Sequence, residues 1–329
     1  MQAETTLGRA EELAERILPE RTPKRRMLVI VNPYATTVSD RLKNLVVYAL
    51  QSRYAVEAVD TEKPGHATQI CRESAREGYD VVVAFGGDGT VNEAANGLVG
   101  SETPLSVLPG GSTNVWCRTV GIPNDVVDAT EHLLRMADDF HPRRVDLGRA
   151  DERHFVFASG VGLDASVVER VDAHPYRKAR FGAWYYSAAA VAIFNRRYLV
   201  NPPVVRVTAG ERTLTGITVV IQNSDPFTYF RSRPIRVTEP AGLETGSLSA
   251  AVLKRATLLE LPSLIPRLLS TRARTVLRHA QVEGLGELHE FRIDAVDGRP
   301  FPLEVDGDYI GDFHSVRYGV VPGGLAVVA

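Results

Sequence analysis

Short apolar runs alternate with amphipathic stretches through the first part of the chain, up to about residue 142. Uninterrupted apolar runs are typical of strands buried on both faces, and apolar residues at every third or fourth position are typical of helices. The runs predict strands at 27–31, 54–60, 79–85 and 105–108, and the amphipathic stretches predict helices at 40–52, 66–77, 91–98 and 125–136. Strands that alternate with helices predict a parallel α/β sheet with helices on both faces.

The pattern changes from residue 143 onward, where short alternating segments are separated by Gly, Pro and Asp turns. Such segments predict an antiparallel β-sandwich. The expected strands are 155–158, 204–209, 214–222, 234–238, 247–253, 281–283, 290–295 and 303–305. Two helical stretches, 178–194 and 258–269, interrupt them, and a short amphipathic helix is expected at 6–18, inside the N-terminal segment 1–23.

Composition and charge narrow the class of protein. The chain has 329 residues, a length that fits two domains. Its formal net charge of −2 gives no basic field that would indicate binding to nucleic acid. The two cysteines, Cys71 and Cys117, lack the spacing of metal ligands, so we expect buried free thiols in a reducing compartment. The N-terminus is charged, and the longest apolar run, 183–194, is too short to span a bilayer, which needs about 20 residues. We therefore expect a cytoplasmic protein without a transmembrane segment.

A glycine turn, Gly86-Gly87-Asp88-Gly89-Thr90, stands between a predicted strand and a predicted helix. Glycine lets the backbone bend and lets a ligand approach closely. The free N–H groups of the first turn of a helix attract anions, phosphate above all. Asp88 adds a carboxylate where a phosphate-bound Mg²⁺ could lie. The turn therefore predicts a phosphate site.

Polar residues also follow the other predicted strands of this half. Asn32 follows the first strand, Thr61 follows the second, and Ser112 lies in a second glycine turn, 109–114, after the fourth. Ligands of parallel α/β sheets bind at the carboxyl ends of the strands. With Asp88, these residues converge on one edge of the sheet, which predicts a nucleotide site there.

The eight residues from Gly86 to Glu93, GGDGTVNE, resemble the nucleotide-binding signature of the diacylglycerol kinase catalytic-domain family, whose shorter GGDG core also occurs in NAD kinases and phosphofructokinases. The Asn-Pro turn, the threonine after the second strand and the second glycine turn are similar to family features as well. The sequence departs from the family at 34–37, where Tyr-Ala-Thr-Thr replaces Ser-Gly. The resemblance implies that ATP contacts Asn32, Pro33, Thr61, Gly86, Gly87, Asp88, Gly89, Thr90, Asn92, Glu93, Gly110, Gly111, Ser112 and Asn114.

The resemblance covers nearly the whole chain from residue 25 and implies its domain organisation. The first domain would be an ATP-binding α/β domain like those of NAD kinase and phosphofructokinase, at 24–142, joined by a returning last strand at about 318–329. The second would be an all-β lipid-substrate domain at 143–317.

The turn Asp306-Gly307-Asp308 carries the candidate general base. Asp-Gly is also the strongest short hairpin signal, so a plain hairpin is the alternative. In the family this turn reads Asp-Gly-Glu and its Glu is the base. Asp308 occupies that position with a side chain one methylene shorter, which sets the carboxylate back by about 1.5 Å. Asp306 is the second candidate.

A second metal site of some bacterial members lies on a Leu-Asp-Asp-Gly turn, and the matching stretch here is Leu243-Glu244-Thr245-Gly246. One carboxylate is longer and the other is replaced by a hydroxyl. Glu244 is thus a weak candidate metal ligand whose alternative role is to hold a turn. Mg²⁺ bound to ATP, near Asp88, is the expected metal.

The resemblance implies an ATP-dependent lipid kinase, with diacylglycerol as first choice of substrate and phosphatidic acid as product. Another lipid alcohol, such as a sphingoid base or phosphatidylglycerol, stays open. NAD kinase is disfavoured because Val91-Asn92-Glu93 and the Asp-Gly-Asp turn continue the lipid-kinase pattern. A degenerate lipid-binding regulator without catalysis is the non-enzyme alternative, since Asp308 and Thr245 replace family acids.

The lipid side is less specific in the sequence. The aromatic stretch 181–194 is either a core helix or one wall of an acyl-chain cleft. Arginines near it and beyond could bind anionic lipid headgroups, each contributing about 1 kcal/mol at an anionic surface. We expect peripheral, salt-sensitive association with the membrane surface, and the sequence leaves a homodimer open.

Overall fold

Two sheets organise the protein, and the strand β18 (Ser315–Val327) ties its two halves together. The computed structural model describes residues 23–173, 189, 192–193, 198, 201–230, 232–270, 272 and 274–329. The helix expected at 6–18 and most of the stretch expected at 178–194 lie outside these residues.

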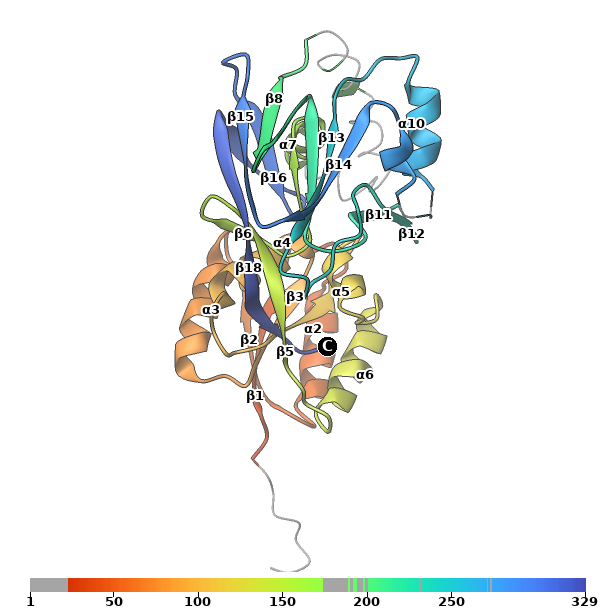
Figure 1. The fold of residues 1–329 in the computed structure, drawn as a ribbon. Helices are drawn as coiled ribbons and strands as arrows, with labels where there is room; N and C mark the ends of the chain where they lie inside the picture. The colour runs from red at the N-terminus through yellow and green to blue at the C-terminus, as the bar shows by residue number, and fades with distance from the viewer. Residues whose placement is uncertain are drawn as a thin grey trace, which may run out of the picture.

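The first half is a parallel sheet in the order β2-β1-β3-β4 with helices on both faces. Figure 1 shows α3 on one side of this sheet and α2 with α6 on the other. The strands are β1 (Arg26–Val31), β2 (Ala55–Asp60), β3 (Val81–Gly86) and β4 (Leu105–Pro109), and the helices are α2 (Asp40–Leu50), α3 (His66–Glu77), α4 (Asp88–Leu98), α5 (Val115–Thr119) and α6 (Val126–Met136). The α/β architecture expected from the alternating pattern is confirmed.

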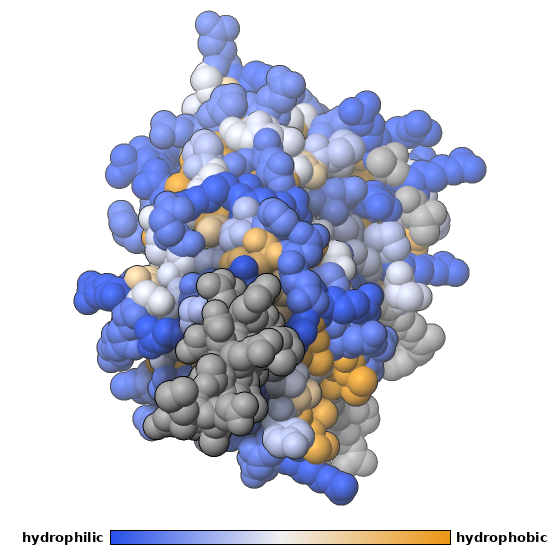
Figure 2. All heavy atoms as spheres, turned by 90° about the horizontal axis from the view of Figure 1, so that it is seen from below, coloured by the Kyte–Doolittle hydropathy of each residue, from blue (hydrophilic) through white to orange (hydrophobic). Residues whose placement is uncertain are grey.

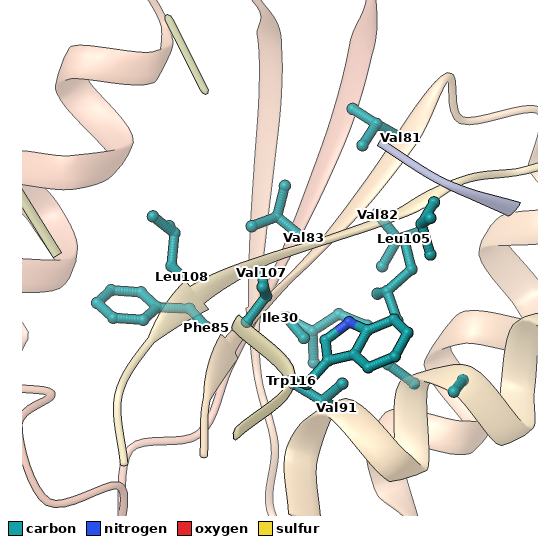
Figure 3. Packing of buried hydrophobic residues seen from close by; sticks show 14 of the residues in the cluster. Ile30, Val81, Val82, Val83, Phe85, Val91, Leu105, Val107, Leu108 and Trp116 are labelled. Carbon is teal, nitrogen blue, oxygen red and sulfur yellow. The ribbon is translucent and has the colours of Figure 1, made fainter. Parts of the chain in front are cut away.

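The core of this half explains why the apolar runs become strands. Every residue of β3 is buried, and Figure 3 shows its valines and Phe85 among Ile30, Leu108 and Trp116. Trp116 is 1% exposed and is contributed by the short helix α5. Cys71 and Cys117 are buried free thiols, as expected. Burial of each large apolar side chain contributes about 1.5–3 kcal/mol to the stability of the fold, so this core stabilises the sheet that carries the glycine turns.

The second half is an antiparallel sandwich. One layer continues the first sheet through β18, β15 (Glu290–Ala295), β8 (Val205–Ala209) and β9 (Arg212–Gly216), with β5 (Arg143–Ala150) and β6 (Arg153–Phe155) branching from β18. The other layer has the order β14-β13-β10-β7-β16-β17. Its strands are β7 (Ala158–Val161), β10 (Thr218–Gln222), β13 (Leu248–Leu253), β14 (Val282–Leu288), β16 (Phe301–Val305) and β17 (Asp308–Phe313). A small hairpin of β11 (Thr228–Phe230) and β12 (Arg233–Ile235) stands apart.

The sandwich expected from the alternating segments is confirmed, with some corrections to its strands. The run 155–158 is not one strand: β6 ends at Phe155 and β7 begins at Ala158, and the backbone N–H groups between them turn toward a carboxylate described below. The run 214–222 divides at Gly216, where a methyl group would lie 2.5 Å from Val252 Cγ1. The stretch 258–269 forms the shorter helix α10 (Leu261–Leu268), and the 3₁₀ turn η2 (Val276–Arg278) follows it.

Helix α7 (Leu163–Asp172) was not predicted and covers the outer face of the second layer, where it contacts β16, β17 and β7. The last strand does return to the first half, as the resemblance implied: β18 pairs with β5 along most of its length, and Val327 pairs in parallel with Leu105 of β4. The two halves therefore share one continuous sheet. Viewed from below, the exposed face is mostly hydrophilic, with hydrophobic residues gathered at one side (Figure 2).

Candidate functional site

The two glycine turns lie directly against each other. They follow the neighbouring strands β3 and β4, and Gly110 N–H donates to Gly86 O at 2.8 Å. A methyl group on Gly110 would lie 2.9 Å from Gly86 Cα, and one on Gly111 would lie 2.9 Å from Gly87 Cα. Backbone lies on backbone here, so only glycine fits at these positions. The two turns thus pack backbone against backbone at the carboxyl ends of β3 and β4, where Gly110 is buried and Gly87 and Gly111 are partly exposed.

Asn32 and Thr90 tie the end of β1 to the start of α4. Asn32 Nδ2 donates to Thr90 Oγ1 at 3.1 Å, and Asn32 Oδ1 accepts from the Tyr34 N–H at 3.0 Å. A methyl group on Gly86 would lie 2.4 Å from Thr90 Oγ1, so Gly86 makes room for this bond. Pro33 continues the same turn, and Thr61 follows β2, where its N–H donates to Val31 O at 2.8 Å.

Asp88 joins the first glycine turn to the second. Its Oδ2 accepts from the Val115 N–H at 3.0 Å and its Oδ1 accepts from the Trp116 N–H at 3.1 Å, at the start of α5. In the second turn, Asn114 has φ of 49°, its Oδ1 accepts from the Gly111 N–H at 2.9 Å, and its Nδ2 donates to Gly111 O at 2.9 Å. Ser112 lies between them. Asp88 thus holds the two glycine turns together, a role that sequence reasoning did not assign to it.

Glu93 and Asn92 hold other elements onto α4. Glu93 Oε1 accepts from the Gly65 N–H at 2.7 Å and its Oε2 accepts from the Ala67 N–H at 3.1 Å, which caps α3. Asn92 Nδ2 donates to His154 O at 2.9 Å and to Asp306 Oδ2 at 2.7 Å, so it bridges to the second half. Both side chains are committed to protein partners. Their expected contact with the nucleotide stays a prediction.

Asp306 is buried, 2% exposed, and its carboxylate is fully occupied. Oδ2 accepts from Asn92 Nδ2 and the Val156 N–H, each at 2.7 Å, and Oδ1 accepts from the Phe157 N–H at 3.0 Å and the Ala158 N–H at 3.1 Å. A carboxylate offers about four acceptor positions, and all are taken. Burial raises the pKa of Asp306 to about 7, and the four hydrogen bonds limit this rise because they favour the ionised form. Asp306 locks the turn to both halves of the protein.

Asp308 faces the first turn of α4. It is the first residue of β17 and is partly exposed. A methyl group on Gly89 would lie 2.9 Å from Asp308 Oδ2 and 3.1 Å from its Oδ1. The carboxylate therefore rests beside the glycine turn, although it comes from the opposite half of the molecule and 219 positions further along the chain. The structure brings the predicted base and the predicted phosphate surface together.

A second carboxyl pair lies beside this turn and was missed in the sequence. A methyl group on Gly160 would lie 2.6 Å from Asp164 Oδ2 and 2.7 Å from Glu304 Oε1, so the two groups meet over this glycine, where they form a hydrogen bond. Burial raises the pKa of Asp164 to about 6, and burial together with the Asp164 charge raises the pKa of Glu304 well above its ordinary value. Glu304 Oε2 also accepts from the Gly307 N–H at 2.8 Å. The pair shares a proton and supports the backbone of the turn.

One sequence signal could have revealed this pair. Glu304 stands in the run Phe-Pro-Leu-Glu-Val, and every residue of that strand is buried. A charged side chain inside an apolar strand needs a partner. That the partner is Asp164 of α7 could not be read from the sequence, because 140 positions separate the two.

The structure gives no support for a metal site at Glu244. Its Oε1 pairs with Arg143 Nη1 at 2.7 Å on the surface. The neighbouring turn is held instead by Asp146, which is buried and accepts from the Gly246 N–H at 2.6 Å and the Gly323 N–H at 2.8 Å. Among the described residues no group of three His, Cys, Asp or Glu side chains could hold a metal ion.

Comparison with known proteins finds a matching domain model over part of the chain. The family model of the diacylglycerol kinase catalytic domain matches residues 26–150. A diacylglycerol kinase of Staphylococcus aureus, strain bovine RF122 / ET3-1, is 35% identical over 141 residues, which are 40% of this chain and 42% of the relative. That of strain JH9 is 33% identical over 139 residues, with the same shares covered. The matched part thus spans less than half of these relatives.

Solved structures extend the likeness of fold to nearly the whole chain. A diacylglycerol kinase from Bacillus anthracis str. Sterne superposes with a TM-score of 0.66 at 20% identity, covering 94% of this chain and 98% of that one. Another solved chain from the same organism gives a TM-score of 0.70 at 22% identity over the same shares. Residues 26–150 thus match the diacylglycerol kinase catalytic domain, and in that part the chain is similar to bacterial diacylglycerol kinases.

Proposed function

We propose that the protein is an ATP-dependent lipid kinase that transfers the γ-phosphate to the hydroxyl of diacylglycerol and releases phosphatidic acid. One observation carries the proposal. The Asp308 carboxylate lies against Gly89, so a candidate base and a candidate phosphate surface meet at one point between the two halves. Phosphoryl transfer mainly needs positioning, charge stabilisation and a group that takes the hydroxyl proton.

The paired glycine turns and the start of α4 fit the phosphates of ATP. Gly87 and Gly111 are partly exposed and carry no side chain, so oxygens can approach their backbone closely. The first-turn N–H groups of α4 attract negative charge. Asn32, Pro33, Thr61 and Ser112 border this surface at the strand ends and are proposed to line the nucleotide site with Thr90 and Asn114.

Mg²⁺ fits the same place as a companion of ATP. This ion is usually bound by one or two carboxylates together with phosphate oxygens and water. Asp88 is the carboxylate at the turn, and its oxygens already order α5 through two N–H bonds. When bound, the ion would neutralise charge on the transferring phosphates. Asp88 is proposed to orient the turn and to lie near the ion.

Asp308 is proposed as the general base, in preference to Asp306. All four acceptor positions of Asp306 are used within the protein, so it has none to offer a hydroxyl. In the proposed reaction the lipid oxygen forms a bond to the γ-phosphorus while the bond from that phosphorus to the bridging oxygen breaks. Asp308 accepts the hydroxyl proton, and ADP leaves with the bonding electrons. The Glu304–Asp164 pair holds the Gly307 backbone beside it.

The lipid substrate implies work at a membrane surface, and we infer a peripheral, cytoplasmic protein. None of the described helices combines the length and apolar character needed to cross a bilayer. A homodimer is an additional possibility that sedimentation can decide.

The test is transfer of labelled γ-phosphate to diacylglycerol, sphingosine, phosphatidylglycerol and NAD, offered one at a time to the full chain with Mg²⁺. We expect label on diacylglycerol and loss of that label in Asp308→Asn. Label only on sphingosine or phosphatidylglycerol would keep the lipid kinase and replace its substrate. Label on NAD alone would overturn the lipid assignment, and ATP binding without any transfer would point to a regulator.

A further inference from the structure

Helix α10 presents an apolar surface to solvent. None of its residues is buried. Large side chains at and just before it are exposed: Leu258 by 59%, Leu259 by 91%, Ile265 by 48% and Leu269 by 42%. Ile265 and Leu269 are one helical turn apart and share a face. Four exposed apolar side chains within twelve positions form a patch, which we call the α10 patch, and such patches mark interaction sites.

Other leucines of α10, adjacent to Ile265 and Leu269 around the helix, anchor it to the second half of the protein. Leu264 and Leu268 pack on a cluster that includes Ile235 and Val276. Leu261 packs on the cluster of Tyr198 and Ile217, as Leu163 of α7 does. These contacts fix α10 on the second half of the protein (Figure 1). Ile265 and Leu269 lie at the edge of the packed side and stay about half exposed, and Leu258 and Leu259 precede the helix.

The chain segment that carries the α10 patch is rich in basic residues. The segment 254–278 contains six basic residues and one acidic residue, whereas the whole chain has a formal net charge of −2. These basic residues are Lys254, Arg255, Arg267, Arg272, Arg274 and Arg278. Lys254 pairs with Glu283 at 2.7 Å and Arg274 pairs with Glu239 at 2.5 Å. Arg272 and Arg278 are exposed and form no ion pair with another described residue.

We propose that the α10 patch docks on a membrane that contains anionic lipid, with its leucines in the interface and its arginines at the lipid phosphates. Apolar side chains flanked by positive charge are the combination that binds such an interface. A protein partner would need acidic groups opposite the arginines and a complementary apolar groove, whereas a bilayer supplies both chemistries on any face. This inference rests on the proposed lipid kinase and specifies where that enzyme meets its substrate.

The place of α10 suits delivery of a lipid to the site. Leu261 of α10 and Leu163 of α7 pack on the same cluster. Leu163 precedes Asp164, whose carboxyl group meets Glu304 beside the Asp306–Asp308 turn. The α10 patch and the candidate base are thus linked through contacting elements on the outer face of one sheet. A lipid that leaves the bilayer at α10 would lie on the outer face of the second layer, whose strand β17 begins at Asp308.

Vesicle sedimentation without ATP tests the docking apart from catalysis. The full chain is mixed with vesicles of phosphatidylcholine, or of phosphatidylcholine with 30% phosphatidylglycerol as the chosen composition, at about 0.1 M and 0.5 M salt. We expect tighter binding to the anionic vesicles, weakened by salt. Leu258→Ser with Leu259→Ser should weaken it about 100-fold, from about tenfold per leucine withdrawn. Arg272→Gln with Arg278→Gln should weaken it about 25-fold, from about fivefold per arginine, and reduce its salt dependence.

Matched controls come from other surfaces. Leu45→Ser removes a leucine that is 57% exposed on α2, and Arg41→Gln with Arg206→Gln removes two exposed arginines on α2 and β8. Both controls should bind like the unchanged protein. Equal binding by the Leu258/Leu259 variant, equal losses in the controls, or absence of vesicle binding by the unchanged protein would overturn the proposal. A dimer that the Leu258/Leu259 variant dissociates would also overturn the proposal, because a second copy of the chain would then cover the α10 patch.

A kinase assay distinguishes this failure from failure of the proposed function. On a short-chain, water-soluble diacylglycerol the α10 variants should keep the unchanged protein's kcat, while transfer to vesicle-borne diacylglycerol falls with binding. Intact vesicle binding by a protein that phosphorylates no lipid would reject the kinase and leave the docking surface standing.

Discussion

Gly89→Ala should displace the Asp308 carboxylate without lowering the stability of the fold, so it tests the two effects separately. The added methyl group would lie 2.9 Å and 3.1 Å from the two Asp308 oxygens and 3.4 Å from its Cγ. To reach an ordinary carbon–oxygen contact of about 3.4 Å, the carboxylate must move by about 0.5 Å, which a terminal group can do by rotation. Gly89 lies inside α4, where alanine is favoured over glycine by about 0.5–1 kcal/mol. The free energy of unfolding should therefore stay the same or rise.

Activity should move in the opposite direction. A misplacement of about 1 Å in a catalytic group can cost about 100-fold, so a shift of half that size should lower kcat by about tenfold. The assay is steady-state transfer of labelled phosphate to diacylglycerol, paired with urea unfolding. Gly286→Ala is the control, because its methyl group would lie 3.8 Å from the nearest atom, Glu239 Cγ, far from the site.

A double-mutant cycle decides whether the loss acts through Asp308. In the Asp308→Asn background the base is already gone, so Gly89→Ala should cost little more. An equal further loss of kcat in that background would refute the reasoning, because the methyl group would then be acting on the nucleotide. An unchanged kcat for Gly89→Ala alone would show that Asp308 is not the group on which turnover depends.

Three further substitutions test the scaffold of the site. Asp306→Asn turns an amide NH₂ toward backbone N–H donors, and each buried polar group left without a partner costs about 1–3 kcal/mol. Urea unfolding should therefore show a free energy of unfolding that is lower by several kcal/mol. An unchanged free energy of unfolding would show that Asp306 does not lock the turn. Folding raises the pKa of Asp164 to about 6 and also raises the pKa of Glu304, so the free energy of unfolding of the unchanged protein should fall as pH rises from about 4 through 6. Glu304→Gln should make this fall smaller. A variant with the same dependence on pH would contradict the shared proton. Asp88→Ala should abolish transfer and also destabilise the α5 cap by about 1 kcal/mol, visible as a lower thermal midpoint; normal activity in the folded variant would remove Asp88 from the mechanism.

The first half of the fold could be predicted well because its signals are local. Strands such as β3 are buried along their whole length, so an apolar run of the right length predicts them to within a residue or two. Helix α3 begins at His66 and ends at Glu77, as its amphipathic pattern predicts. These elements need no information from the rest of the chain.

The second half depends on contacts that the sequence does not contain. Val156 and Phe157 are apolar and predict a continuous strand, yet their N–H groups bond to Asp306, some 150 positions away. Helix α7 was missed in a region interpreted as strands. The continuous sheet through both halves came from the family resemblance and not from the pattern of residues.

The candidate site divides in the same way. The glycine turns and Asp308 were found because short motifs carry them. The commitment of Asp88, Glu93 and Asp306 to backbone donors could not be predicted, since it depends on which loops meet in space. The Glu304–Asp164 pair left only the signal of one acid in an apolar strand.

The most direct measurement is kcat for labelled phosphate transfer to diacylglycerol by Asp308→Asn, at saturating ATP, with Asp308→Glu beside it. A general base contributes about 10²–10⁴-fold, so Asp308→Asn should lose that factor in kcat while its KM for ATP changes little. Asp308→Glu, which keeps a carboxylate and restores the family's residue, should retain activity. Near-full kcat in Asp308→Asn would contradict the account, because the carboxylate that lies against Gly89 would then have no part in the reaction.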